Sequence, residues 1–240
     1  MPIRAILFGS IGVLCETSDI QRRAYNSAMA YAGLSWEWDT AIYSDLLGIM
    51  GGQARLALLA AATGTALDEF TIESIHARKT DLACAQVREP GRVQPRPGVI
   101  ALAQLAKARG LRLGFVTTTY QPNIDAIFAA IAPALTPADF DYIVARDTVA
   151  RGKPAPDAYH VTLKALGIAA ADALAIKDTA LSVMSARRAG IATIATPGAL
   201  TRGQDFWQAD LVLEALAGSD GVLDPRLIAM IEGEDGSGCA

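Results

Sequence analysis

Several residue types that would point to a function are scarce in this chain of 240 residues. Aromatic residues make up 6% and charged residues 19%, and there are only two histidines. The formal net charge is −4 and no basic stripe stands out, which argues against nucleic acid as a main partner. No apolar run reaches membrane-spanning length and no signal peptide precedes the first apolar segment. We therefore expect a soluble, cytoplasmic protein without a membrane partner.

Cysteine is also rare. Cys15, Cys84 and Cys239 are an odd number and have no paired spacing. This pattern predicts free thiols in a reducing compartment and excludes a disulfide framework.

Hydrophobic residues make up 52% of the chain, and many of them are alanine, which favours closely packed helices over a β-sandwich. Helical spacing predicts helices over residues 18–32, 38–47, 53–62 and 67–87, and no strand is predicted between Glu16 and Arg92. From Arg92 onward predicted helices alternate with short apolar strands, at 111–117, 142–145, 173–176 and 191–195. This alternation is typical of an α/β fold with a doubly wound parallel sheet.

The same patterns divide the chain into parts. Residues 1–15 and 92–232 form the predicted α/β core, and residues 16–91 form an all-helical insertion. Residues 233–240, rich in Gly, Ser and acidic side chains, are predicted to be a disordered tail.

The first strand has an unusual end. An apolar run reaches Phe8 and stops at Gly9, and a second glycine follows at position 12. This pattern predicts a buried strand that opens into a tight loop at the carboxyl end of the sheet, where open α/β folds bind ligands. The loop offers Gly9, Ser10 and Ile11, none of which is a credible acid, base or metal ligand.

Two later segments carry polar groups suited to a phosphate. Thr117 and Thr118 follow a predicted strand, where hydroxyls and free amides can cradle an anion, although a threonine-rich strand end can also bond only to solvent. Lys153 lies in Arg151-Gly152-Lys153-Pro154-Ala155-Pro156, a stretch that fixes the loop and so positions the ammonium as a counter-charge. The alternative is an ordinary surface lysine in a rigid loop.

A third segment, Lys177-Asp178-Thr179, ends another predicted strand. An acid at this place is a plausible metal ligand or base. Asp178 or Thr179 is equally suited to cap the next helix.

Together these segments resemble the haloacid dehalogenase superfamily, in its phosphatase and phosphomutase branch with a helical cap after the first strand. The chain is most similar to CbbY-type sugar-bisphosphate phosphatases, from Pro2 to about Leu216. The resemblance also rests on Cys15-Glu16-Thr17, on Gly51-Gly52-Gln53-Ala54-Arg55, on Val116-Thr117-Thr118-Thr119 and on Thr196-Pro197 ahead of Asp205-Phe206.

The resemblance implies a Mg²⁺-dependent site that this chain does not reproduce. In the family the first strand ends in Phe-Asp-x-Asp-Gly, whose first Asp is the nucleophile and whose second is the general acid and base. Those positions hold Gly9 and Ile11 here. The family's two acids at the fourth motif read Lys177 and Asp178, so we expect no Mg²⁺ and no other cofactor.

Two substitutes for the nucleophile are weak. Side chains alternate along a strand, so Ser10 is predicted to point away from the direction shared by Gly9 and Ile11, and no base lies near it in sequence. Cys15 stands where the family has a small or apolar residue, and packing under the cap hinge explains it.

The remaining polar groups still suit an anion. Counting Lys153, Lys177 and Asp178 gives a pocket of about +1, against about −1 for the family's pocket with its metal. Lys177 replaces the missing cation either by pairing with Asp178 or by reaching an anion.

In the cap, Gly51, Gly52 and Arg55 match the family's substrate loop, while Gln53 replaces a Lys and Gln21 replaces a His. Arg55 grips a second phosphate or forms a plain salt bridge.

The sequence therefore favours a non-catalytic member of the family that binds inorganic phosphate or a phosphorylated sugar. One alternative is an active phosphatase or hydrolase that uses a non-standard site on a small phosphorylated metabolite. Another is a structural or protein-interaction role without a ligand. The oligomeric state and any protein partner stay open.

Overall fold

The computed structural model describes residues 2–49 and 51–233 of the chain. Six parallel strands form one sheet in the order β3-β2-β1-β4-β5-β6, so β1 lies in the middle. The strands are β1 (Ala5–Phe8), β2 (Arg112–Val116), β3 (Tyr142–Val144), β4 (Ala173–Lys177), β5 (Ala192–Ala195) and β6 (Leu211–Val212). Because β1 pairs with β2 on one side and β4 on the other, the ends of these three strands converge on one edge.

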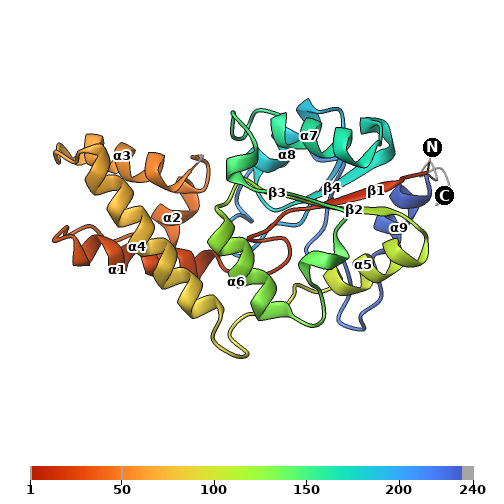
Figure 1. Ribbon diagram of the computed structural model, residues 1–240, viewed down its shortest axis with the longest axis horizontal. Helices are drawn as coiled ribbons and strands as arrows, with labels where there is room; N and C mark the ends of the chain where they lie inside the picture. The colour runs from red at the N-terminus through yellow and green to blue at the C-terminus, as the bar shows by residue number, and fades with distance from the viewer. Residues whose placement is uncertain (1, 50, 234–240) are drawn as a thin grey trace.

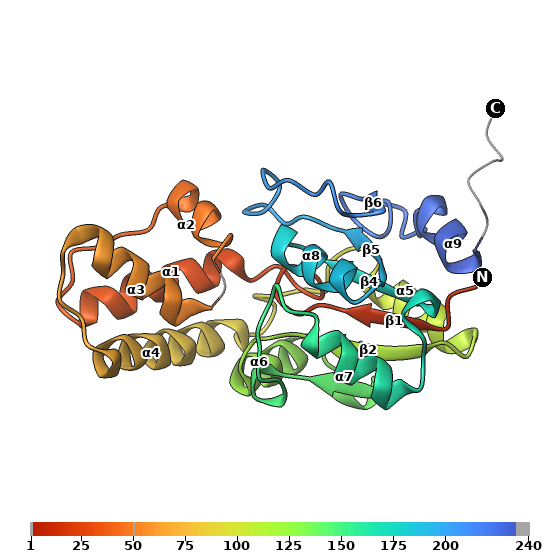
Figure 2. The same cartoon turned by 90° about the horizontal axis from the view of Figure 1, so that it is seen from above.

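Helices cover both faces of the sheet, as Figures 1 and 2 show. One face carries α5 (Val99–Ala108), α6 (Gln121–Ile131) and α9 (Pro225–Glu232), and the other carries α7 (Asp157–Leu166) and α8 (Ala180–Arg188). Alternate residues of β1 serve the two layers: Ile6 and Phe8 join the first core, and Ala5 and Leu7 join the second. A strand buried on both faces explains the unbroken apolar run at the start of the sequence.

The first four helices after β1 gather beyond the carboxyl ends of the strands (Figure 1). They are α1 (Ser18–Tyr31), α2 (Thr40–Leu46), α3 (Gly52–Thr63) and α4 (Glu69–Val87), here called the helical lobe. A separate apolar cluster holds them together, with Tyr25, Trp38 and Tyr43 at its centre. Helix α4 packs against α6 of the sheet-bearing part, and Ser44 Oγ donates to the Leu200 carbonyl oxygen at 2.6 Å.

The parallel sheet and its alternating helices confirm the predicted fold class, and the described part of the lobe contains no strand. Two elements were missed. Strand β6 is only two residues long, and α9 follows a loop-rich stretch that gave no clear period. The predicted boundaries at 15/16 and 91/92 stay a prediction. The predicted tail lies outside the described residues except for Gly233, which caps α9.

The two cysteines within the described residues, Cys15 and Cys84, are free and buried, whereas Cys239 lies outside them. Cys15 packs in the larger core, and burial raises the pKa of its thiol to about 12, which suits packing and not nucleophilic chemistry. In the described part of the chain, no helix has the length and apolar character needed to cross a membrane.

Candidate functional site

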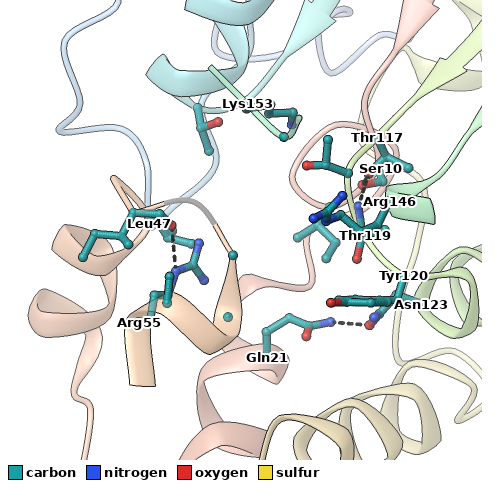
Figure 3. A pocket seen from close by; sticks show the side chains of 18 of the residues that line it. Ser10, Gln21, Leu47, Arg55, Thr117, Thr119, Tyr120, Asn123, Arg146 and Lys153 are labelled. Atoms are coloured by element: carbon teal, nitrogen blue, oxygen red, sulfur yellow. Dashed lines mark hydrogen bonds between the residues drawn. The ribbon is translucent and has the colours of Figure 1, made fainter. Parts of the chain in front are cut away.

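A cavity of about 430 Å³ lies between the strand ends and the helical lobe. It brings together most of the residues that the sequence singled out, from segments far apart in the chain. They are Ser10, Ile11, Gln21, Gly51, Gly52, Gln53, Arg55, Thr117, Thr118, Lys153 and Asp178. Figure 3 shows Ser10, Thr117 and Lys153 on the side of the strand ends, and Arg55 on the side of the lobe.

A longer side chain at Gly9, at the end of β1, would require the Val13 side chain to shift. A Cβ atom built on Gly9 would lie 2.7 Å from Val13 Cγ2, so the Val13 side chain fills the space beside it. Ile11 lines the cavity and contributes only apolar surface. The end of the first strand therefore presents no carboxylate to the cavity.

Ser10 does not point away from the cavity, so the prediction from strand alternation was wrong. Strand β1 ends at Phe8, and the chain then turns tightly: the Val13 and Leu14 amides both donate to the Ser10 carbonyl oxygen, at 3.1 and 2.9 Å. Side-chain alternation does not extend beyond a strand. Ser10 is buried, and its Oγ lies 2.7 Å from Thr117 Oγ1 (Figure 3). The nearest polar partner is thus a hydroxyl and not a base.

Thr117 joins this hydroxyl pair to a backbone amide. Its Oγ1 accepts a hydrogen bond from the Thr119 amide at 3.1 Å, directly after β2. Thr118 lines the same cavity. Hydroxyls beside backbone amides are groups that can bind a tetrahedral anion, so the phosphate cradle stays a prediction.

Lys153 is held by hydroxyls. Its Nζ donates to Ser182 Oγ at 2.7 Å, and Ser182 Oγ lies 2.7 Å from Thr179 Oγ1. Thr179 caps α8, which decides the alternative between Asp178 and Thr179. Burial lowers the pKa of Lys153 below its usual range, and the nearby Asp178 carboxylate acts in the opposite direction.

Lys177 forms no ion pair with Asp178 and does not line the cavity. Both predicted roles of Lys177, pairing with Asp178 and reaching an anion, are therefore wrong. It is the last residue of β4 and faces the same layer as Ala175, under α7. Its side chain is completely buried, Nζ donates to the Val116 carbonyl oxygen at 3.0 Å, and the ammonium lies 5.1 Å from the centre of the Tyr159 ring. Burial holds the pKa of Lys177 well below its usual value.

Asp178 is the one carboxylate among the described residues that line the cavity. It is 9% exposed, and burial raises its pKa to about 6, although Lys153 acts to lower it. Gly12 packs so closely that a Cβ atom there would clash with the Asp178 carboxylate, at a φ of 77°. Only glycine suits both the contact and the backbone.

The helical lobe supplies the predicted Arg55 and a second cationic side chain, Lys79, that the sequence did not indicate. Lys79 of α4 is 6% exposed, donates to Gln21 Oε1, and lies 4.6 Å from the centre of the Tyr25 ring. Burial lowers its pKa to about 7, with Arg55 contributing. Arg55 lines the cavity and donates to the Ile49 carbonyl oxygen at 3.1 Å. Among the described residues Arg55 forms no salt bridge, so the alternative role as a plain salt bridge is wrong.

Other missed residues link the two sides of the cavity. Gln21 Nε2 donates to Asn123 Oδ1 of α6 at 3.3 Å, and the His76 ring lies 5.5 Å from the Tyr120 ring. Burial lowers the pKa of His76 to about 4, and the positive charge of Lys79 is the second cause. Arg146 also lines the cavity. A lysine in mid-helix, such as Lys79, gives no sequence signal, because the same spacing is typical of a solvated face.

Comparisons with known proteins agree with this geometry. A family model described as haloacid dehalogenase-like hydrolase matches residues 3–190. The chain belongs to this family. It is 39% identical over 210 residues to protein CbbY of Rhodobacter capsulatus, covering 88% of this chain and 92% of that protein. It is 36% identical over 229 residues to protein CbbY of Cereibacter sphaeroides, covering 95% of this chain and 99% of that protein.

Solved structures give the same result. A mutant of CbbY from Rhodobacter sphaeroides in complex with xylulose-(1,5)bisphosphate superposes with a TM-score of 0.83 at 37% identity, covering 92% of this chain and 99% of that one. CbbY from the same organism in complex with phosphate also gives a TM-score of 0.83, at 36% identity, covering 91% and 98%. The α/β fold and the CbbY-like character are therefore established for this chain.

Proposed function

We propose that this CbbY-like protein binds a phosphate group in the cavity without forming an aspartyl-phosphate. The observation that carries the proposal is the convergence of Ser10, Thr117 and Lys153 on one cavity, at which the first strand ends without a carboxylate. Hydroxyls and a positioned ammonium bind a phosphoryl oxygen, but none of them replaces a carboxylate nucleophile. That relatives bind phosphate and a sugar bisphosphate supports a phosphorylated small molecule as the ligand class.

The donor set argues against Mg²⁺. This ion prefers several oxygen ligands in octahedral geometry, usually with one or more carboxylates. Within residues 2–49 and 51–233, no group of three or more His, Cys, Asp or Glu side chains is placed to hold a metal. Asp178 is alone in the cavity, and the neighbouring Lys177 is a cation buried under the strand ends. The residues present do not fit the family's metal, so we propose binding without it.

The lobe suggests where a second anionic group would lie. Arg55 and Lys79 line the cavity opposite Lys153, and the described ion pairs include neither of them. Cationic side chains that line a cavity without a carboxylate partner favour an anionic ligand. A bisphosphorylated sugar would place one phosphate near Lys153 and the other near Arg55.

Isothermal titration calorimetry in EDTA tests binding. Inorganic phosphate, ribulose 5-phosphate and ribulose 1,5-bisphosphate are titrated into the full chain, and we expect heat with each. No heat from any of them at millimolar concentration would contradict the proposal. Turnover by the unmodified chain with Mg²⁺, lost in Ser10→Ala, would favour an active phosphatase instead.

A restored variant tests whether only chemistry is missing. Gly9→Asp, Ile11→Asp and Lys177→Glu are combined, with and without Val13→Ala, because Val13 fills the space beside Gly9. We expect Mg²⁺-dependent release of phosphate from sugar phosphates only in the variants with room for the carboxylate. The same combination without Gly9→Asp is the matched control.

A further inference from the structure

Ser182 accepts a hydrogen bond from Lys153, and the proposed phosphate site gives its hydroxyl no chemical step of its own. It lies in the first turn of α8, lines the cavity, and is 2.7 Å from Lys153 Nζ. We propose that Ser182 and Lys153 form a nucleophile–base pair that hydrolyses small anionic carboxylic esters. This activity differs in bond and substrate from phosphate binding and does not depend on it.

The hydrogen-bond network fits a serine nucleophile. Thr179 Oγ1 lies 2.7 Å from Ser182 Oγ and is itself 3.3 Å from the Ser182 amide, which donates to it. In the structure Lys153 Nζ donates to Ser182 Oγ. Once Lys153 loses a proton, the Ser182 hydroxyl can donate to Nζ while the Thr179 hydroxyl donates to Ser182 Oγ. A nucleophile, a base within hydrogen-bond reach and a third orienting group are the parts that such a site requires. Ser10 has no comparable partner, because its oxygen faces only the Thr117 hydroxyl.

The surroundings of Lys153 make it easier to deprotonate than a free lysine. No carboxylate forms an ion pair with Lys153 among the residues that the structure describes. The charged groups nearby are Asp178, which favours the ammonium, and Lys177, buried under the same strand ends. Burial outweighs Asp178 and lowers the pKa of Lys153, as a serine-activating lysine requires.

The helix end and the lobe decide the substrate class. Ser182 lies at the positive end of α8, which stabilises negative charge that develops on an attacked carbonyl oxygen. The opposite wall holds Arg55 and Lys79, so an acyl group that carries a carboxylate suits the cavity. A cavity of about 430 Å³ limits the ester to a small molecule.

The step balances without a cofactor. Ser182 Oγ bonds to the carbonyl carbon as the bond to the leaving alcohol breaks, and the serine proton passes through Lys153 Nζ to the alcohol oxygen. Water then attacks the acyl-serine, with Lys153 accepting its proton and returning one to Ser182. The products are the carboxylic acid and the alcohol.

The test uses the full chain with 4-nitrophenyl hydrogen succinate, an anionic ester, and 4-nitrophenyl acetate, a neutral one. We expect a burst of about one nitrophenol per chain, faster with the succinate, and a succinyl group on Ser182 by mass spectrometry. Ser182→Ala abolishes the burst. Lys153→Arg keeps the cation but slows it by about 100-fold, in the range usual for loss of a general base.

Ser185→Ala is the matched control. Ser185 lies one turn further along α8, and its Oγ donates to the Ala155 carbonyl oxygen at 2.7 Å instead of facing a lysine. The control retains the burst, and thermal unfolding checks that each variant folds. Acylation confined to surface lysines, an equal burst in Ser182→Ala, or no burst with either ester overturns the proposal.

Adding inorganic phosphate to the burst assay distinguishes failure of the esterase proposal from failure of the proposed phosphate site. A bound phosphate favours the Lys153 ammonium and so slows acylation, which we expect to see with added inorganic phosphate. A burst that phosphate does not slow, with no binding heat, overturns the proposed phosphate site and leaves the Ser182 pair standing. Binding heat without a burst overturns the Ser182 pair alone.

Discussion

The two walls of the cavity differ in the kind of charge that they present. The strand ends offer hydroxyls, one half-buried lysine and one carboxylate, whereas the helical lobe offers Arg55 and Lys79 with no carboxylate beside them. The strand-end wall holds its groups by short hydrogen bonds to neighbouring turns, and the lobe wall holds Lys79 through a Gln21 amide that bridges to α6. Both walls are therefore arranged for an anion, but neither contains the family's carboxylate pair.

The difference assigns distinct tasks to the walls. The strand ends are expected to fix the phosphate that every ligand shares, and the lobe to select among ligands by their second charged group. Single substitutions on either wall can break this division.

Removing the Lys153 ammonium should have the largest effect. In Lys153→Met we expect the affinity for inorganic phosphate to fall by about 100-fold, because a charge-assisted hydrogen bond contributes about 1.5–3 kcal/mol. Calorimetry measures the change, and Lys164→Met, at an exposed lysine of α7, is the control. An unchanged affinity would place the phosphate on the lobe wall instead.

Lys79→Met should stabilise the protein in a pH-dependent way. Burial lowers the pKa of Lys79 from 10.5 to about 7, so folding penalises the ammonium fully below pH 7. The penalty declines as pH rises from 7 to 10.5, where the unfolded lysine also loses its proton. We expect a gain of about 2 kcal/mol in unfolding free energy at pH 6, after loss of the Gln21 contact. Little gain should remain at pH 10.5.

Urea denaturation at the two pH values measures this effect, again with Lys164→Met as the control. An equal gain at both values would show that the Lys79 charge is not penalised in the fold. Lys79 would then stay an ammonium in the fold at neutral pH, and the lobe wall would carry a full positive charge there.

Ser10→Ala should weaken phosphate binding by about tenfold, because a hydroxyl hydrogen bond to a charged phosphate oxygen contributes about 1.5 kcal/mol at the low end of its range. Calorimetry with inorganic phosphate checks it, and Ser185→Ala serves as a buried serine that does not line the cavity. A loss as large as that of Lys153→Met would mean that the Ser10–Thr117 pair, and not the lysine, fixes the anion.

Arg55→Ala should have the smallest effect, and only on selectivity. We expect the preference for ribulose 1,5-bisphosphate over ribulose 5-phosphate to fall by about threefold, since a partly exposed charge contributes less than about 1 kcal/mol. Inorganic phosphate should bind as before. Weaker binding of all three ligands would show that both walls hold the same phosphate.

Sequence patterns were sufficient where a local period or a constrained loop was present. The buried run of β1, the glycine-limited helices and the Pro-rich loop of Lys153 were all predicted, and the structure places Thr117, Lys153 and Asp178 at one cavity. Predictions failed where geometry depends on a turn or on a neighbouring element. Ser10 lies beyond the strand, so alternation gave the wrong direction, and Lys177 was assigned to the cavity although it faces α7.

By itself, the sequence determined the fold class and the absence of an acid at positions 9 and 11, because both depend only on residue identity and local period. Tertiary structure alone decided which polar side chains share the cavity. The burial that lowers the pKa of Lys79, the contact of Ser182 with Lys153 and the closure of the space beside Gly9 by Val13 all join parts of the chain through packing. Packing of this kind leaves no local pattern in the sequence, since each partner residue is ordinary in its own segment.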